Sequence, residues 1–341
     1  MNKITLNVPD GIEHLSEWQE LWNTLPTNQH YILNKRICGC GATEAYIRSD
    51  KKVILASPRK HLLYNKYSQH LKDNLHLYRF TGNKKKYFES RTTSPTDILA
   101  FNDSLTGYIK SGGNKILTTY DSLRKIMEAL KDSGENLSQW IVVVDEFQAI
   151  FYDCQYKAIT EYEFCQVLQK FPTVVYLSAT PYLESYLDKI EQFKDLLVYE
   201  LLWSEAMTQL PNVEVVKSKK SVSELCSDLI EKYRSGNGKS TIVNGQTFIA
   251  KEAVFYINSV AEIKKIIRKN NLKPEEVTII CSAKTENLNK LDILSRDTGM
   301  KFNIGEIPRK GEIHKMFTFC TSTVYVGADF YSTNALSLIH I

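Results

Sequence analysis

Short runs of apolar, largely β-branched residues recur along the first two hundred positions, and each run ends in small or polar residues. A continuous apolar run of this length is typical of a strand buried on both faces of a parallel sheet. Segments with helical spacing at 61–71, 123–130 and the second half of 151–170 separate several of the runs. The runs themselves cover residues 31–33, 53–56, 115–118, 141–144 and 173–177. This alternation predicts an α/β fold with a parallel sheet.

A second series with the same alternation begins after position 250. Residues 254–258 and 277–281 are strand-like runs, and a helical segment with four basic residues lies between them at 259–269. A further apolar run covers residues 314–320. A chain of 341 residues is too long for one typical core and suits two domains. We therefore predict a second α/β domain in this part of the chain.

Two acidic residues and a glutamine follow the run at 141–144. Asp145 and Glu146 stand at the carboxyl end of a strand expected to be buried, and Gln148 comes two positions later. Acids are costly there unless a ligand or metal needs them, and open α/β sheets bind ligands at this edge. An Asp can hold Mg²⁺ through water, and the following Glu can orient a hydrolytic water. A solvated acidic turn is the alternative interpretation.

A glycine-rich turn follows the first predicted strand. A phosphate-binding loop needs glycines for close backbone approach, a lysine for the phosphates and a Ser or Thr for Mg²⁺. Gly39, Gly41 and Thr43 fit this pattern, but Ala42 takes the position that the lysine usually occupies. Either the site is inactive, or a cation at the mouth of the loop replaces the missing one. We expect Lys35 to be that cation.

Two other basic residues compete with Lys35 for this role. Arg36 is its neighbour in sequence, and Lys239 belongs to a Gly-Lys-Ser triplet within residues 236–241. A phosphate loop ending in that triplet needs a glycine at position 233, which is Tyr233. The preceding segment, 222–234, has a helical rather than a strand pattern. We therefore interpret residues 236–241 as a helix C-cap followed by a polar turn.

Ser178 and Thr180 belong to a Ser-Ala-Thr-Pro segment about thirty residues after the acidic pair. In this order, the glycine-rich turn, the acidic motif and the Ser-Ala-Thr segment resemble the nucleotide-handling motifs of superfamily 2 helicases, the DEAD/DEAH-box-like ATPases. The resemblance is to a phage- or mobile-element-like member with a variant Walker A motif, and it extends more weakly over most of the chain. It implies two RecA-like parallel-sheet domains, ATP and Mg²⁺ as ligands, and coupling to a nucleic acid through Ser178 and Thr180.

The resemblance also implies roles for individual residues. The nucleotide would be held by Lys35, Gly39, Gly41, Ala42, Thr43 and Glu44, and from the second domain by Gly327 and Asp329. Hydrolysis would depend on Asp145, Glu146 and Gln148, with Thr43 and Asp145 on the metal. Nucleic acid would be contacted by Ser57, Arg59, Thr119, Thr321 and Ser322. A basic and aromatic loop at residues 82–91 is a further candidate for that contact.

The expected domain boundaries follow from these segments. Residues 1–25 form a lead-in with a helix around 12–25, residues 26–203 the first RecA-like domain, 204–219 a hinge, and 220–335 a second, incomplete RecA-like domain. No arginine-finger motif follows Asp329, so this fragment is expected to be weakly active or inactive. Residues 336–341, LSLIHI, can be encoded by the mosaic-end adapter of transposon-based sequencing libraries. They are a candidate non-native tail, and a natural apolar terminus is the alternative.

Composition and charge set limits on these interpretations. The chain has 43% hydrophobic and 24% charged residues and a formal net charge of +4, which permits a nucleic-acid partner without requiring one. No apolar run approaches the roughly twenty residues that cross a bilayer, and the N-terminus lacks an apolar signal core. We expect a cytoplasmic protein without membrane contact. The seven cysteines are scattered, and the spacing of Cys38 and Cys40 does not match zinc or redox motifs.

The sequence therefore predicts a nucleic-acid-dependent ATPase of the superfamily 2 helicase type. We expect DNA rather than RNA as its partner, and the sequence does not determine an oligomeric state. ATP rather than GTP rests on the resemblance alone, because residues 1–25 contain no identifiable adenine-reading element. The alternative from another class is a degenerate nucleotide-site protein that acts as a nucleic-acid-binding or scaffold module. Ala42 and the missing arginine finger favour that alternative.

Overall fold

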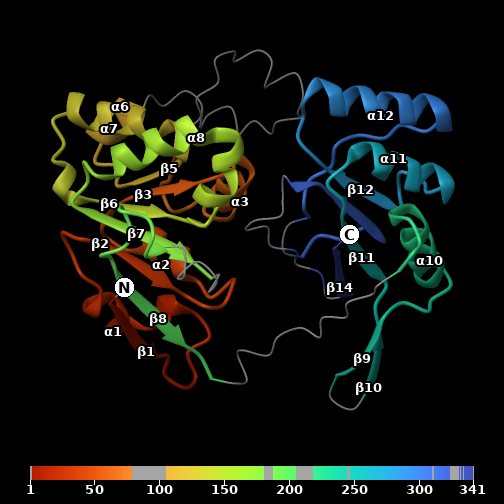
Figure 1. Cartoon of the computed structure of the whole chain (residues 1–341), viewed down its shortest axis with the longest axis horizontal. Helices are drawn as coiled ribbons and strands as arrows, with labels where there is room; N and C mark the ends of the chain where they lie inside the picture. Colours follow the sequence, from red (N-terminus) through yellow and green to blue (C-terminus); the bar gives the residue numbers. More distant parts are fainter. Residues whose placement is uncertain are drawn as a thin grey trace. The chain divides into compact units, whose positions relative to one another are not determined.

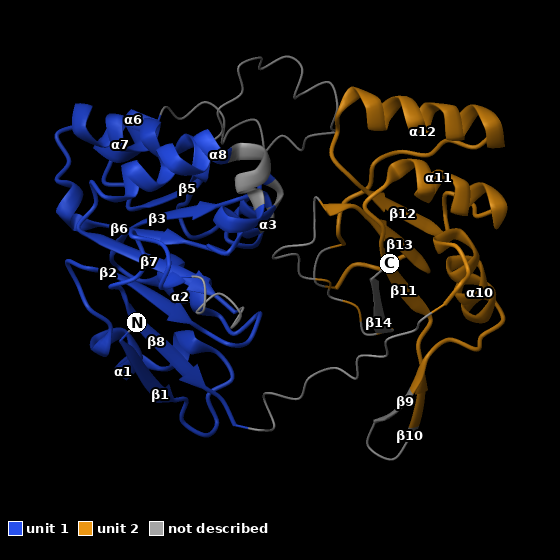
Figure 2. Ribbon diagram, in the orientation of Figure 1, with its two compact units in different colours: residues 1–211 blue, residues 212–341 orange. Residues whose placement is uncertain are grey.

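The computed structural model describes residues 2–78, 105–179, 187–204, 218–243, 246–308, 311–322, 330, 332 and 334–340. The chain divides into two compact units, Met1–Pro211 and Asn212–Ile341 (Figure 2). Each unit contains a parallel sheet of its own. Most of the predicted hinge, at 205–217, lies outside the described residues.

Unit 1 is built on an eight-stranded sheet in which all described neighbouring strands pair in parallel (Figure 1). The order of the strands is β1-β8-β2-β7-β6-β3-β5-β4. Their bounds are β1 (Lys3–Asn7), β2 (His30–Asn34), β3 (Lys52–Ser57), β4 (His76–Leu77), β5 (Lys115–Thr119), β6 (Trp140–Val144), β7 (Thr173–Ser178) and β8 (Leu197–Leu202). Because the strands are parallel, the carboxyl ends of β2, β7 and β6 lie side by side at one edge of the sheet.

Helices cover both faces of this sheet. They are α1 (Gln19–Thr24), α2 (Ala42–Arg48), α3 (Lys60–Gln69), α6 (Leu105–Lys110), α7 (Leu123–Asp132) and α8 (Ala149–Leu168), with short 3₁₀ turns η1 (Leu15–Glu17), η2 (Tyr120–Ser122) and η3 (Leu137–Gln139). Side chains alternate along β6, so that Val142 and Val144 pack with α7 and α8, whereas Val143 packs with α1 and α2. Burial on both faces explains why β6 is a continuous apolar run.

The sequence predicted five of the eight strands of this sheet from their apolar runs. It did not predict β1 or β8. A strand-like run at 77–80 overlaps β4 at Leu77, and residues 79 and 80 lie outside the described part of the chain. The predicted single helix at 12–25 is divided into η1 and α1, and α8 is helical from Ala149 rather than in its second half alone. No helix in the described part of the chain combines the length and the apolar character of a membrane span.

Unit 2 contains a four-stranded parallel sheet in the order β12-β13-β11-β14. The strands are β11 (Glu252–Tyr256), β12 (Val277–Ile280), β13 (Phe317–Cys320) and β14 (Ala335–His340). Three helices, α10 (Val222–Arg234), α11 (Val260–Lys269) and α12 (Thr285–Thr298), pack with the main core of this unit (Figure 1). A separate antiparallel hairpin is formed by β9 (Ser240–Val243) and β10 (Gln246–Ile249). The predicted second α/β fold is therefore confirmed.

Residues 236–239 form the turn after helix α10, as the sequence predicted, whereas Ser240 and Thr241 already belong to β9. Helix α10 begins at an N-cap, Ser221, whose hydroxyl accepts a hydrogen bond from the amide of Glu224, and it ends at Arg234. Gly236 then adopts a left-handed φ of 77°, and its amide donates to the carbonyl of Tyr233 at 3.1 Å. A glycine at this position is a common helix terminator.

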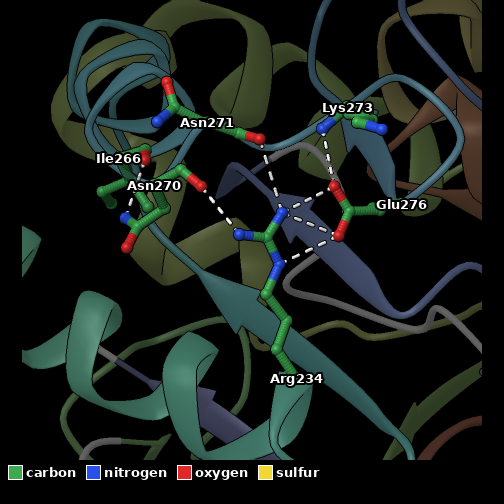
Figure 3. Close-up of polar contacts among 6 residues, drawn as sticks. All are labelled: Arg234, Ile266, Asn270, Asn271, Lys273 and Glu276. Atoms are coloured by element: carbon green, nitrogen blue, oxygen red, sulfur yellow. Dashed lines mark hydrogen bonds and ion pairs between the residues drawn. The ribbon is translucent and has the colours of Figure 1, made fainter.

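Arg234 fastens the end of α10 to the turn between α11 and β12 (Figure 3). Its guanidinium donates to the carbonyl of Asn270 at 2.8 Å and, through two nitrogens, to the carboxylate of Glu276 at 2.7–2.9 Å. The same carboxylate accepts the amide of Lys273 at 2.8 Å. The planar guanidinium makes several hydrogen bonds at once in a fixed geometry. The ammonium of a lysine cannot reproduce this arrangement.

Candidate functional site

Lys35 lies between the two acidic residues that follow β6. Its Nζ is 3.8 Å from Oδ1 of Asp145 and 3.7 Å from Oε1 of Glu146, and the side chains of all three residues are largely buried. The contact arises from topology, because β2, which precedes Lys35, is separated from β6 only by β7. The amide of Lys35 donates to the carbonyl of Ser178, the last residue of β7, at 2.8 Å.

The charges of this triad do not balance, because one ammonium faces two carboxylates. Burial opposes the charge on Lys35, but the two carboxylates outweigh it and raise the pKa of the ammonium above its ordinary value. Burial, followed by repulsion from Asp145, raises the pKa of Glu146 above the ordinary value of 4.5. The triad therefore combines a permanent cation with a carboxyl group whose pKa is shifted toward neutrality.

Arg36, the neighbouring cation, points to a different partner. Its guanidinium donates to the carboxylate of Glu200 on β8, which also pairs with Lys3 at 3.1 Å. Glu200 is buried, so an arginine turned toward the acidic triad would leave this carboxylate with Lys3 as its one described cationic partner. Arg36 also has a left-handed φ of 61°. The sequence gave no indication of Glu200.

The glycine-rich turn passes close to Lys35. Gly39 and Gly41 both adopt the left-handed conformation, with φ of 73° and 79°, which glycine accepts without steric cost. A Cβ atom on Gly41 would stand 3.3 Å from Cβ of His14, whereas one on Gly39 would meet nothing within 4 Å. Lys35 lowers the pKa of the Cys40 thiol, although burial raises it more. The turn therefore requires glycine at two positions and brings its thiol near the Lys35 ammonium.

The first residues of α2 have different surroundings. Ala42 and Thr43 are both buried, and Ala42 belongs to the core beneath the turn. Glu44 contacts Arg48 at 2.7 Å and Nε2 of His70 at 3.3 Å. Within the described contacts, Glu44 is thus tied to α3 rather than to the acidic triad.

A side-chain relay connects the end of β7 to Glu146. The hydroxyl of Ser178 donates to the side-chain oxygen of Gln148 at 2.9 Å. The amide nitrogen of Gln148 donates in turn to Oε2 of Glu146. All three residues are buried, so the relay holds the carboxylate of Glu146 in one orientation.

Tyr120 also contacts the acidic turn, and the sequence assigned it no role. Its hydroxyl donates to the carbonyl of Asp145 at 2.7 Å and lies 3.3 Å from that of Glu146. The only signal in the sequence was its position directly after Thr119, at the end of a predicted strand. Nothing there indicates which backbone it would reach.

The residues predicted to contact nucleic acid lie at strand ends in both units. Ser57 and Thr119 are the last residues of β3 and β5, and both are buried. Arg59 is the partly exposed N-cap of α3. In unit 2, Thr321 is buried directly after β13, and the amide of the exposed Ser322 donates to the side chain of Asn258 at 3.2 Å. Thr180, Gly327, Asp329 and the loop at 82–91 lie outside the described residues.

This chain is similar to known proteins in its fold and not in its sequence. No protein-family model matches the sequence, and no curated protein matches it. The solved structure of S. cerevisiae Dbp5 bound to RNA and ADP BeF3 is similar over 94% of this chain and 72% of its own, with 14% identity and a TM-score of 0.51. The E. coli DExH-box NTPase HrpB is similar over 95% of this chain and 35% of its own, with 12% identity and a TM-score of 0.48. At 14% identity the likeness to the Dbp5 structure is one of fold: an α/β chain with a large parallel sheet and a second, smaller one of the RecA-like kind.

Proposed function

We propose that this chain is a nucleic-acid-dependent ATPase of the superfamily 2 helicase type, which couples ATP hydrolysis to translocation along, or unwinding of, a nucleic acid. The observation that carries the proposal is the buried ammonium of Lys35, 3.7–3.8 Å from two carboxylates beside a left-handed glycine turn. A buried cation at the carboxyl edge of a parallel sheet suits a phosphate ligand. The nucleotide in the Dbp5 structure, ADP BeF3, supports ATP as the ligand class here.

The phosphates would be bound by Lys35 and by the backbone around Gly39 and Gly41. A triphosphate carries more negative charge than the two carboxylates, so the ammonium can exchange part of its attraction to them for attraction to the phosphates. Ala42 contributes no charge to this arrangement. Lys35 thus replaces the lysine that a phosphate loop usually carries at the position of Ala42, and it does so from the end of β2.

The residues present fit a magnesium ion. Oδ1 of Asp145 is buried, and no described group donates a hydrogen bond to it. A carboxylate oxygen is the kind of hard ligand that Mg²⁺ prefers. Asp145 and the hydroxyl of Thr43 would hold the ion, which when bound would neutralise charge on the phosphates.

Glu146 would be the general base that orients and deprotonates the attacking water. A raised pKa suits this task, because a base is most effective when its pKa lies near the working pH. Gln148 and Ser178 would keep the Glu146 carboxylate directed at the water. They would also transmit a movement of the end of β7 to that carboxylate. Thr180 would extend this coupling along the chain.

The nucleic acid would be contacted at the strand ends that carry Ser57, Arg59 and Thr119 in unit 1, and Thr321 and Ser322 in unit 2. Gly327 and Asp329 would approach the nucleotide from unit 2. The RNA in the Dbp5 structure is compatible with an RNA partner for this fold, so our expectation of DNA rather than RNA stays a prediction.

The second candidate function is a nucleotide-site relative that binds nucleic acid without hydrolysis. It is favoured by Ala42, which is buried in the core and leaves the usual lysine position without a cation. Single-turnover release of labelled phosphate from ATP, measured with and without single-stranded RNA and DNA of one sequence, separates the two. We expect release that either strand accelerates. No release, together with retained nucleic-acid binding, would establish the second candidate instead.

A further inference from the structure

Tyr120 occupies a fixed position between the end of β5 and the acidic turn. It begins η2 directly after Thr119, and its side chain is buried. Its ring stacks on Phe164 of α8, with centroids 4.3 Å apart and an angle of 15° between the planes. This stack fixes the ring independently of its hydroxyl. The stack therefore remains available to hold the ring when the hydroxyl is removed.

The phenol donates its single proton to the backbone of the acidic turn. The carbonyl of Asp145 accepts at 2.7 Å, and the carbonyl of Glu146 lies 3.3 Å from the same hydroxyl. Glu146 has a φ of 54°, a left-handed conformation that is unfavourable for a residue with a Cβ atom. A residue keeps such a conformation only when the surrounding contacts specify it.

Backbone hydrogen bonds also hold the same turn, and two of them act on its amides. The amide of Asp145 donates to the carbonyl of Ala56 on β3 at 2.9 Å, and the amide of Phe147 donates to the carbonyl of Leu177 on β7 at 3.1 Å. A third acts on a carbonyl, since that of Glu146 accepts the amide of Ala149 at 2.9 Å. Among the described contacts, Tyr120 is the one that reaches the carbonyl of Asp145. The peptide between Asp145 and Glu146, which leads into the left-handed backbone of Glu146, is held through its carbonyl by this phenol.

We propose that Tyr120 is a positioning residue: its hydroxyl holds the Asp145–Glu146 peptide in the conformation in which Glu146 faces the attacking water. The proposal rests on the proposed ATPase function. It adds a second route to Glu146, through the backbone, beside the side-chain relay from Ser178 and Gln148. Because Tyr120 directly follows Thr119, a ligand that shifts the end of β5 would shift the acidic turn through this phenol.

The substitution Tyr120→Phe tests the proposal, because it removes the hydroxyl and keeps the ring stacked on Phe164. Its matched control is Tyr176→Phe. Tyr176 is fully buried on the neighbouring strand β7, and its hydroxyl has no hydrogen-bond partner among the described residues. Both changes remove one buried phenol hydroxyl from the same core, but only the first removes a contact to the acidic turn.

Two measurements on the full chain give the result. In single-turnover ATP hydrolysis, Tyr120→Phe should slow the chemical step roughly three- to tenfold, the loss expected for one buried hydrogen bond, with nucleotide affinity unchanged. In native-state hydrogen exchange, amides of residues 145–149 should exchange faster in this variant, while those of the neighbouring strands keep their rates. Tyr176→Phe should change neither quantity.

The two measurements separate failure of this inference from failure of the proposed function. Unchanged exchange at residues 145–149 overturns the positioning role, whatever the activity. Faster exchange with an unchanged hydrolysis rate, or with a loss of nucleotide affinity as large as the loss of rate, overturns it as well. If the parent chain neither binds nor hydrolyses ATP, the proposed function fails, and the catalytic part of this inference fails with it.

Discussion

On the proposed function, replacing Glu146 with glutamine should separate nucleotide binding from hydrolysis. The carboxylate oxygen Oε2 accepts a hydrogen bond from Gln148, and the side-chain oxygen of a glutamine can accept the same bond. Shape and the relay to Ser178 are therefore preserved. What disappears is the negative charge and the ability to take a proton from water.

The size of each effect follows from these contacts. Loss of a general base lowers the rate of the chemical step by about 10²–10⁴-fold. The substitution also removes one of the two carboxylates near Lys35, at 3.7 Å, an attraction of up to about 4.5 kcal/mol at an effective dielectric constant of 20. Lys35 is then held by Asp145 alone and is freer to meet the phosphates. We expect ATP affinity in Glu146→Gln to equal or exceed that of the parent.

The pH dependence gives an independent check. Glu146 must be ionised to act as a base, so hydrolysis by the parent should fall as the pH drops through its folded-state pKa, which burial raises above 4.5. The folded protein also holds this proton more tightly than the unfolded chain. Its free energy of unfolding therefore decreases as the pH rises from 4.5 through the raised pKa, and Glu146→Gln should remove that decrease.

Fluorescent-nucleotide titration, single-turnover phosphate release and denaturant unfolding over a pH series measure these three quantities. Lost ATP affinity with surviving hydrolysis would refute the assignment of Glu146 as the base. So would a variant whose unfolding free energy keeps the pH dependence of the parent.

Two further predictions concern the glycine turn and the unit 2 core. Gly41→Ala should weaken nucleotide binding and lower the melting temperature more than Gly39→Ala, because both pay about 1–2 kcal/mol for a left-handed alanine but only the first also meets His14; equal effects would contradict this. Arg234→Lys should cost unit 2 about 1–2 kcal/mol, a value that allows for the partial exposure of the pair with Glu276. All four tryptophans lie in unit 1, so tryptophan fluorescence should be unchanged while the circular-dichroism transition shifts, and a shift in both would contradict the contact.

The parts of the fold that the sequence predicted are those specified by local pattern. Strand β6 is four apolar residues in a row, and α10 has a capping serine, an apolar stripe and a terminating glycine, so both could be recognised without knowing their neighbours. Strand β8 was missed because Glu200 interrupts its apolar run. That glutamate is tolerated in a buried strand only because Arg36 and Lys3 pair with it, and they stand far away in sequence.

The candidate site likewise has parts that could be predicted from the sequence and parts that could not. Spacing and residue type were enough to select Asp145, Glu146 and the glycine turn, since each follows a recognisable strand. Which of Lys35 and Arg36 points its side chain toward the acidic pair could not be decided from the sequence. The answer depends on Glu200 of β8, a strand that the sequence did not predict. The contact of Tyr120 could not be predicted, because it depends on how η2 meets a backbone carbonyl 25 residues later.

The central claim is that Lys35 supplies the phosphate-binding charge that Ala42 lacks. The most direct test is the affinity of a fluorescent ATP analogue for Lys35→Ala, compared with Arg36→Ala and Lys239→Ala. We predict that Lys35→Ala weakens binding about 10- to 100-fold, as expected for loss of a charge-assisted contact. Arg36→Ala, which loses only its pairing with Glu200, and Lys239→Ala, at the end of α10, should bind like the parent. Parental affinity in Lys35→Ala, or an equal loss in either control, would contradict the claim.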